Sequence, residues 1–174
     1  MQKLMKTKTA SILATMNVLS WIAYIGISIK CGAIIFTYVL SLFNEQVAKD
    51  LYQGLNLYDL KNESFLHYSL IVGITAGLLA LKAYVAHLVI KVLSKINLKS
   101  PFDMEVALQM EKISIMILYL WLISLGARIY QEILDLPNMD WNGGEALFLS
   151  GLIFLFAQIF KKGVEIQAEN DLTV

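Results

Sequence analysis

The chain has 174 residues, of which 57% are hydrophobic and 16% are charged, and its mean hydropathy is +0.63. This composition is too apolar for an ordinary water-soluble domain of that length, so it indicates an integral membrane protein. The 14 basic and 14 acidic residues balance, and direct binding of nucleic acid is not expected. The single cysteine, Cys31, excludes an internal disulfide and a multi-thiolate metal site within one chain.

Four apolar segments predict membrane-spanning helices, over residues 10–43, 65–96, 106–134 and 146–160. The first segment is long for one crossing and too short for two, so we interpret it as one long helix. A cleaved signal peptide is the alternative there, but the apolar run resumes after Lys30 and continues to Phe43. The spans and their short loops fill the chain. They predict one all-α integral membrane domain of residues 1–174, a four-helix bundle with up-down-up-down topology.

The basic residues are distributed unevenly between the two sides that this topology creates. Lysines cluster near the N-terminus, around the connection between the second and third spans, and directly after the fourth span. The other two connections carry mostly acids. Because Lys and Arg near span ends bias their side towards the cytoplasm, both termini are predicted to be cytoplasmic. Residues 161–174 then form a cytoplasmic tail.

The loop between the first and second spans, residues 44–64, contains Val47, Leu51 and Leu55 at four-residue spacing. Polar residues separate them, and this pattern predicts a short amphipathic helix lying on the outer surface. The aromatic residues on this side are interpreted as anchors at the membrane interface: Tyr52, Tyr58, Tyr68, Tyr130 and Trp141.

Small residues in the second span allow another helix to approach closely. Gly73 and Gly77 fit the small-xxx-small pattern. The pattern serves either packing within the chain or association of two copies, so a homo-oligomer is one of two open alternatives.

Lys82 also lies within the second span. An ionisable side chain inside a span is a functional-site hypothesis by default, because burying it in lipid costs at least about 2.5 kcal/mol. Lys30 lies near enough to the outer end of its span to reach water, whereas Lys82 can do so only in part. Lys82 is therefore predicted to face the bundle interior, paired with a polar group such as Gln158. The alternative is a structural lysine that extends to the headgroups.

Three polar residues share one face at the end of the second span. His87, Lys91 and Lys95 repeat at i, i+4 and i+8, where the helix leaves the membrane. The other ligands that a metal ion requires are missing, so no metal site is predicted.

The segment Ser100-Pro101-Phe102-Asp103 predicts the start of the third helix. A serine one residue before a proline and three before an acid suits an N-cap, a first helical position and a capping-box partner. The third helix is therefore predicted to begin at Pro101, after a tight turn over residues 97–100.

The last eleven residues, VEIQAENDLTV, follow the step Lys161-Lys162-Gly163. No helix breaker appears before Asn170, so the fourth helix is predicted to continue to about Ala168. Acidic residues add nothing to orientation, which favours a specific contact over solubility alone. The acids of the tail are predicted to lie near the lysines of the second span. The candidate contact surface comprises Lys91, Lys95, Lys99, Ser100, Pro101, Phe102, Glu165, Glu169, Asn170 and Asp171.

Enzyme motifs are missing from the sequence. It contains no nucleophile elbow, no phosphate-binding glycine loop, no HExxH and no cluster of Cys or His. We therefore predict a protein that is not an enzyme and has no cofactor.

Two segments resemble a known family. The run NGGEALFLSGLIFLFAQIFKKGVEIQAENDLTV, Asn142 to Val174, resembles the C-terminal signature of a bacterial membrane family called domain of unknown function 2975. The Pro101-Phe102 step, followed by Glu105 and Val106, is similar to the Asn-Pro-Phe segment of that family, with Ser100 in place of the usual Asn. The resemblance implies a four-span protein of the bacterial inner membrane, often encoded beside a small helix-turn-helix regulator.

The function predicted first is that of a regulatory or interaction protein, whose cytoplasmic hairpin tip and acidic tail engage a soluble partner. The resemblance implies a small helix-turn-helix regulator as that partner. The second is a transporter or channel subunit for a small molecule or an ion, which would use Lys82 in the bundle interior. A membrane enzyme ranks third, because no acid, base or metal constellation is present.

Overall fold

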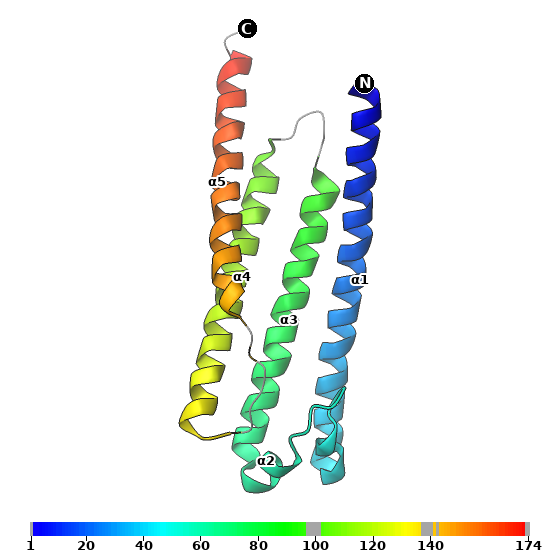
Figure 1. Ribbon diagram of the computed structural model, residues 1–174, viewed down its shortest axis with the longest axis vertical. Coiled ribbons are helices and arrows are strands. Elements are labelled where there is room, and N and C mark those ends of the chain that lie inside the picture. The colour runs from blue at the N-terminus through cyan, green and yellow to red at the C-terminus, as the bar shows by residue number, and fades with distance from the viewer. Residues whose placement is uncertain (1, 97–101, 137–140, 142, 173–174) are drawn as a thin grey trace. The chain divides into compact units, whose positions relative to one another are not determined.

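The computed structural model describes residues 2–96, 102–136, 141 and 143–172. Within these ranges the chain is helical and contains no strand (Figure 1). The four long helices are α1 (Gln2–Phe43), α3 (Phe65–Lys95), α4 (Met104–Ile133) and α5 (Gly144–Leu172). Two short helices, η1 (Glu45–Lys49) and α2 (Tyr58–Glu63), lie between α1 and α3. The all-α prediction is confirmed.

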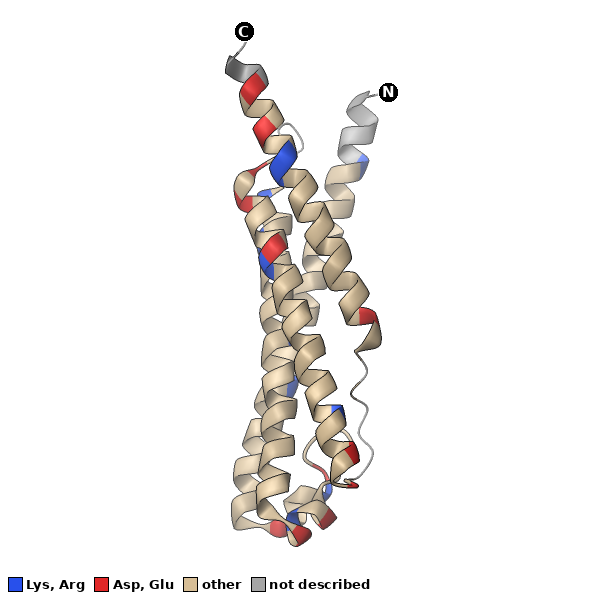
Figure 2. Ribbon diagram, turned by 90° about the vertical axis from the view of Figure 1, so that its left-hand side faces the viewer, with Lys and Arg blue, Asp and Glu red and all other residues tan. Residues whose placement is uncertain are grey.

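Each long helix is long and apolar enough to cross a membrane, over Lys8–Phe43, Phe65–Lys95, Met104–Ile133 and Gly144–Glu169. Figure 2 shows that the charged residues gather towards the helix ends, with long uncharged stretches between them. These four helices indicate a multi-pass membrane protein. The predicted bounds of the second span differ from α3 by one residue, whereas α5 continues far beyond the predicted end of the fourth span at residue 160.

The start of α4 differs from the prediction. Asp103 is the N-cap: its side-chain Oδ1 accepts a hydrogen bond of 2.7 Å from the backbone N–H of Glu105, and its carbonyl accepts one of 3.0 Å from Ala107. The first helical residue is Met104, so the prediction of a helix that begins at Pro101 is wrong. An aspartate accepts hydrogen bonds from the free N–H groups of a first turn as well as a serine does. Its negative charge also interacts favourably with the positive end of the helix dipole.

The chain divides into two compact units. The first unit comprises residues 1–24, 84–119 and 144–174, and the second comprises residues 25–83 and 120–143. Segments of α1, α3 and α4 contribute to both units, while α5 belongs to the first. The single domain that the sequence predicts stays a prediction.

The core of the second unit includes the loop between α1 and α3. Leu51 and Leu57 are buried together with Ile34 and Tyr68. The loop is not the single surface helix that the leucine spacing predicted, because η1 and α2 are separated by a turn. Gln53 and Gly54 have positive φ angles of 49° and 86° there, which ends a regular helix. The leucines pack inwards instead of facing a membrane surface.

Hydrogen bonds between side chains join separate segments of the second unit. The buried hydroxyl groups of Ser41 and Tyr68 lie 2.6 Å apart, and His67 Nδ1 lies 2.5 Å from the Tyr130 hydroxyl. Trp141 Nε1 donates to Gln131 Oε1 at 2.5 Å. Tyr68 is 0% exposed, so it is a core residue and not the interface anchor that the sequence suggested. Its ring adds apolar burial while its hydroxyl finds a partner.

The core of the first unit is smaller. Leu88 of α3 packs with Ile113 and Ile117 of α4, and partly buried residues of α3, α4 and α5 surround them. The Ser150 hydroxyl of α5 donates to the backbone carbonyl of Ser114 at 2.8 Å. This bond satisfies a buried hydroxyl and fixes α5 against α4.

Candidate functional site

The two residues of the predicted intramembrane site belong to different units of the chain, Lys82 to the second and Gln158 to the first. The Lys82 side chain is exposed in the second unit, and its predicted pairing in the bundle interior stays a prediction. A long aliphatic stem allows a lysine to extend its ammonium group away from the packed helix surface. Gln158 has a different partner: its Nε2 donates to Glu111 Oε1 at 3.4 Å.

Gln158 is part of an ion-pair cluster that joins α4 to α5. Lys161 Nζ lies 2.7 Å from Glu111 Oε2, and both side chains are 25% exposed. The Ser114 hydroxyl donates to the backbone carbonyl of Glu111 at 2.7 Å. Sequence reasoning missed this pair. Glu111 and Lys161 carry opposite charges and fall on the same side of the predicted topology, but the segments are far apart in sequence and their register could not be read from spacing.

The two segments that carry the family resemblance meet in the first unit. The Phe102 ring, just before α4, packs edge-on against Phe160 of α5, with 5.6 Å between ring centroids and 66° between their planes. The same ring covers Gly163, where an added Cβ would overlap the Phe102 ring atoms. Glycine at 163 therefore permits the close approach of an aromatic ring to the backbone of α5. We call the residues Phe102, Phe160, Gly163, Glu111 and Lys161 the α4–α5 junction.

Among the lysines of α3, Lys95 has a partner on α4 in place of the predicted partner in the tail. Lys95 forms an ion pair with Glu105 in the first turn of α4. This partner is nearer in sequence than the tail and is held in place by the start of α4. Lys91 is exposed. Lys99, Ser100 and Pro101 lie outside the described residues.

The tail continues α5 as a helix to Leu172. This agrees with the predicted continuation past Gly163 and extends it beyond Ala168. Glu165 pairs with Lys162 at 2.8 Å, one helical turn earlier, and not with α3. Local i, i+3 pairing requires no other element, so it takes precedence over a distant partner. Glu169 is exposed, and the side chains of Asn170 and Asp171 lie outside the described part of the chain.

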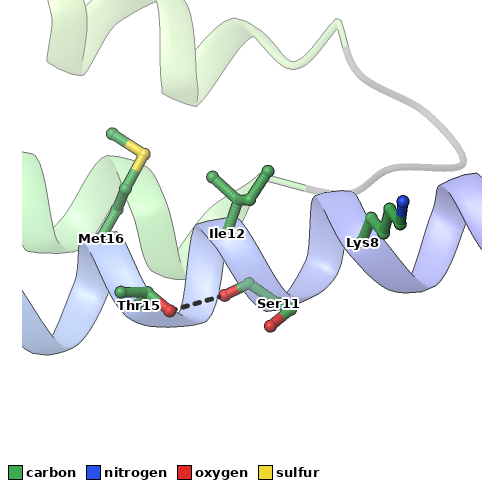
Figure 3. A pocket seen from close by; sticks show the side chains of 5 residues that line it. All are labelled: Lys8, Ser11, Ile12, Thr15 and Met16. Carbon is green, nitrogen blue, oxygen red and sulfur yellow. Dashed lines mark hydrogen bonds between the residues drawn. The ribbon is translucent and has the colours of Figure 1, made fainter.

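The remaining candidate sites are a metal site and a hollow beside α1, and neither brings polar groups from several elements together in the described part of the chain. Among the residues that the structure describes, no group of three His, Cys, Asp or Glu side chains could hold a metal ion. Figure 3 shows a hollow beside α1, lined by Lys8, Ser11, Ile12, Thr15 and Met16. The Thr15 hydroxyl donates to the carbonyl of Ser11 at 3.0 Å, within the same helix. Specific ligand sites usually bring polar groups from several elements together, and the described lining of this hollow comes from one helix.

The α4–α5 junction can hold α5 in one orientation, because an aromatic contact at Phe160 and an ion pair at Lys161 fix two adjacent residues of that helix. The junction gives the tail a rigid base. Its five residues contain no nucleophile and base arranged for catalysis. No protein-family model, curated protein or solved structure matches this chain.

Proposed function

We propose that the protein is a small bacterial inner-membrane protein that binds a soluble partner through its tail. In this proposal it is an up-down-up-down four-helix bundle with both termini in the cytoplasm. The supporting observation is the continuity of α5, which remains helical through Lys161-Lys162-Gly163 to Leu172. Residues 161–172 correspond to about 18 Å of helix at a rise of about 1.5 Å per residue.

An ordered arm suits recognition. A tail that is already helical loses less conformational freedom when a partner binds than a flexible tail would. Figure 1 shows that, within the first unit, the last turns of α5 run past the end of α3 and the start of α4. Glu165, Ile166 and Glu169 are exposed on these turns. They offer a partner two carboxylates and one apolar side chain.

The family resemblance supports the nature of the partner. It implies a small helix-turn-helix regulator encoded nearby, so we propose a protein–protein contact with such a regulator and no direct contact with nucleic acid. The proposed role is regulatory and not enzymatic. A transporter built around Lys82 has less support, because that side chain is exposed.

Copurification from the native host tests the proposal. The tagged protein should recover a stoichiometric soluble DNA-binding protein. The double variant Glu165→Gln/Glu169→Gln should lose it, because the two exposed carboxylates are removed without a change of size. The matched control, Glu132→Gln/Glu145→Gln, neutralises two exposed acids at other helix ends and should retain the partner. Equal recovery by both variants, or no soluble partner for the unchanged protein, would contradict the proposal.

Topology has its own test. In a Cys31→Ser background, Glu63→Cys should react with a membrane-impermeant thiol reagent in whole cells, and Glu169→Cys should react only after the cells are opened. Both positions are exposed, so labelling reports sidedness and not burial. The reverse pattern would place the tail outside the cytoplasm and overturn the proposed orientation.

A further inference from the structure

The loop between α1 and α3, residues 44–64, folds back along the side of α1 (Figure 1). The helix ends at Phe43, yet Thr37 donates its hydroxyl proton to the carbonyl of Leu51 at 2.6 Å. Lys30 lies further back still, with its Nζ 5.9 Å from the ring centroid of Tyr52. At a rise of about 1.5 Å per residue, the backbones of Thr37 and Lys30 lie about 9 Å and about 20 Å before the end of α1, and the long lysine stem carries Nζ from there to Tyr52. We call residues 44–64 the re-entrant loop.

Hydrogen bonds within the re-entrant loop fix its shape. Leu57 N–H donates to the carbonyl of Ala48 at 2.9 Å, and Leu51 N–H donates to the carbonyl of Leu55 at 2.9 Å. At the tip, the N–H of Gly54 donates to Asp50 Oδ1 at 2.9 Å. The loop is therefore a defined structure, and its buried residues Ala48 and Leu51 attach it to the core of the second unit.

The outer side of the re-entrant loop is polar. Lys49, Asp50, Gln53 and Asn56 are all exposed. Hydrocarbon provides no hydrogen-bond partner for the N–H and C=O groups of irregular backbone and no solvation for charged side chains. Membrane proteins therefore place such backbone only inside protein or beside water. This side of the loop therefore requires water.

The neighbouring outer faces of α1 and α3 have the opposite character. Phe36 of α1 is 63% exposed, and Phe43 at its end is 87% exposed. At the start of α3, Phe65 and Leu66 are 54% and 62% exposed. These side chains continue the apolar surface of the spans to the helix ends and require lipid. One end of the second unit thus presents a surface for lipid and a surface for water at the same level of α1.

We propose that the re-entrant loop forms one wall of a water-filled vestibule, which enters the membrane beside α1 and hydrates Lys30. The vestibule admits water and small polar solutes to a depth that the apolar outer face of α1 would otherwise exclude. It explains how the one charged side chain between Ala10 and Phe43 is tolerated: the ammonium group meets the Tyr52 ring and water, and not lipid.

Cysteine labelling in a Cys31→Ser background tests the vestibule. A small, charged, membrane-impermeant methanethiosulfonate reagent is added to vesicles of both orientations, so the result does not depend on topology. Gln53→Cys and Asn56→Cys should react within about tenfold of the rate at Glu63→Cys, because water bathes all three. Phe36→Cys and Val39→Cys, on the apolar face of α1, should react at least about fiftyfold more slowly, as expected for a charged reagent in hydrocarbon.

Adjacent residues of α1 test its depth. Lys30→Cys should react, whereas Ile29→Cys, which is 59% exposed on the apolar surface, should not. Equal labelling of Phe36→Cys and Gln53→Cys would show that the whole end of α1 stands outside the membrane. Protection of both loop positions would show that the loop is covered. Either result overturns the vestibule and leaves the proposed role of the tail untouched. Variants that fail to purify as folded protein can be replaced by Asp50→Cys on the loop and Ile35→Cys on α1, where Ile35 is 49% exposed, which repeats the comparison.

Discussion

The two units of the chain join their helices with different kinds of polar contact. In the second unit the most deeply buried side-chain contact is neutral: Ser41 and Tyr68 are both 0% exposed, and their hydroxyl groups meet. The first unit has a buried neutral bond too, from Ser150 to the Ser114 carbonyl, but it adds a charged contact that remains in touch with solvent, the pair of Glu111 and Lys161 at 25% exposure each. Removing a neutral hydroxyl from water costs far less than removing an ion, so only the neutral contacts can lie in the core.

This difference predicts where each unit is vulnerable. The second unit depends on packing around aromatic residues, and salt should affect it little. The first unit depends on contacts that keep some hydration, and its ion pairs should weaken as salt is added. Substitutions that remove one kind of contact at a time can separate the two contributions.

The largest effect is expected for Tyr68→Ala. The change removes a buried ring and its hydroxyl from the core of the second unit, which should cost about 3–5 kcal/mol of unfolding free energy. Tyr119→Ala, at a tyrosine that is 48% exposed, is the matched control and should cost about 0.5 kcal/mol or less. Unfolding in detergent, followed by circular dichroism, measures both. Equal destabilisation by the two variants would remove the distinction between the units.

Tyr68→Phe sharpens the same comparison. The ring remains and only the hydrogen bond to Ser41 is lost, which should cost about 0.5–1.5 kcal/mol. A loss as large as that of the alanine variant would show that the hydrogen bond, and not the ring, holds this core together.

Gly163→Ala should disturb the α4–α5 junction. The new methyl group would overlap the Phe102 ring and displace it, at an expected cost of about 1–3 kcal/mol. Gly151→Ala, at a glycine of the same helix whose Cβ would meet nothing within 4 Å, should be neutral or stabilising by up to about 1 kcal/mol. In a Phe102→Ala background the cost of Gly163→Ala should disappear. A cost that persists there would show that the clash is not with this ring.

Glu111→Gln should alter the response to salt more than the stability itself. Ion pairs are screened when the Debye length falls to about 3 Å at about 1 M salt. The unfolding temperature of the unchanged protein should therefore fall as salt is added, and Glu111→Gln should reduce that fall because Lys161 loses its charged partner. Tyr68→Phe should leave the salt response unchanged. If the unfolding temperatures of all three proteins change equally with salt, the ion pair of Glu111 and Lys161 does not stabilise the first unit.

The smallest effect is expected from deletion of residues 170–174. The tail makes local pairs such as Lys162 with Glu165, which lies on the retained side of the deletion. Membrane insertion and thermal unfolding should remain the same, while recovery of the proposed partner should fall. A truncated protein that fails to accumulate in the membrane would show that the tail is structural.

The sequence predicted the spans well because a membrane crossing needs length and apolarity, which are both local properties. It predicted α3 to within one residue and the helical continuation of α5 past Gly163. It could not predict that Leu51 packs inwards, because leucine spacing fits a surface helix and a folded loop equally well. The contact of Phe102 with Gly163 was likewise hidden. Each segment was singled out by resemblance, but only a fold brings distant segments together.

Because α5 is one continuous helix, any tilt of its apolar run also moves the tail. Residues 161–172 extend about 18 Å beyond the apolar run, so a tilt of α5 by about 10° would swing its far end sideways by about 3 Å. The apolar run from Ala146 to Phe160 is short, about 22 Å, and short spans respond to bilayer thickness by changes in tilt or local thinning. Any change in the tilt of α5 with membrane thickness would therefore appear as a lateral displacement of Leu172. Distances between spin labels on the tail and on α3, compared in thin and thick bilayers, would measure the conversion.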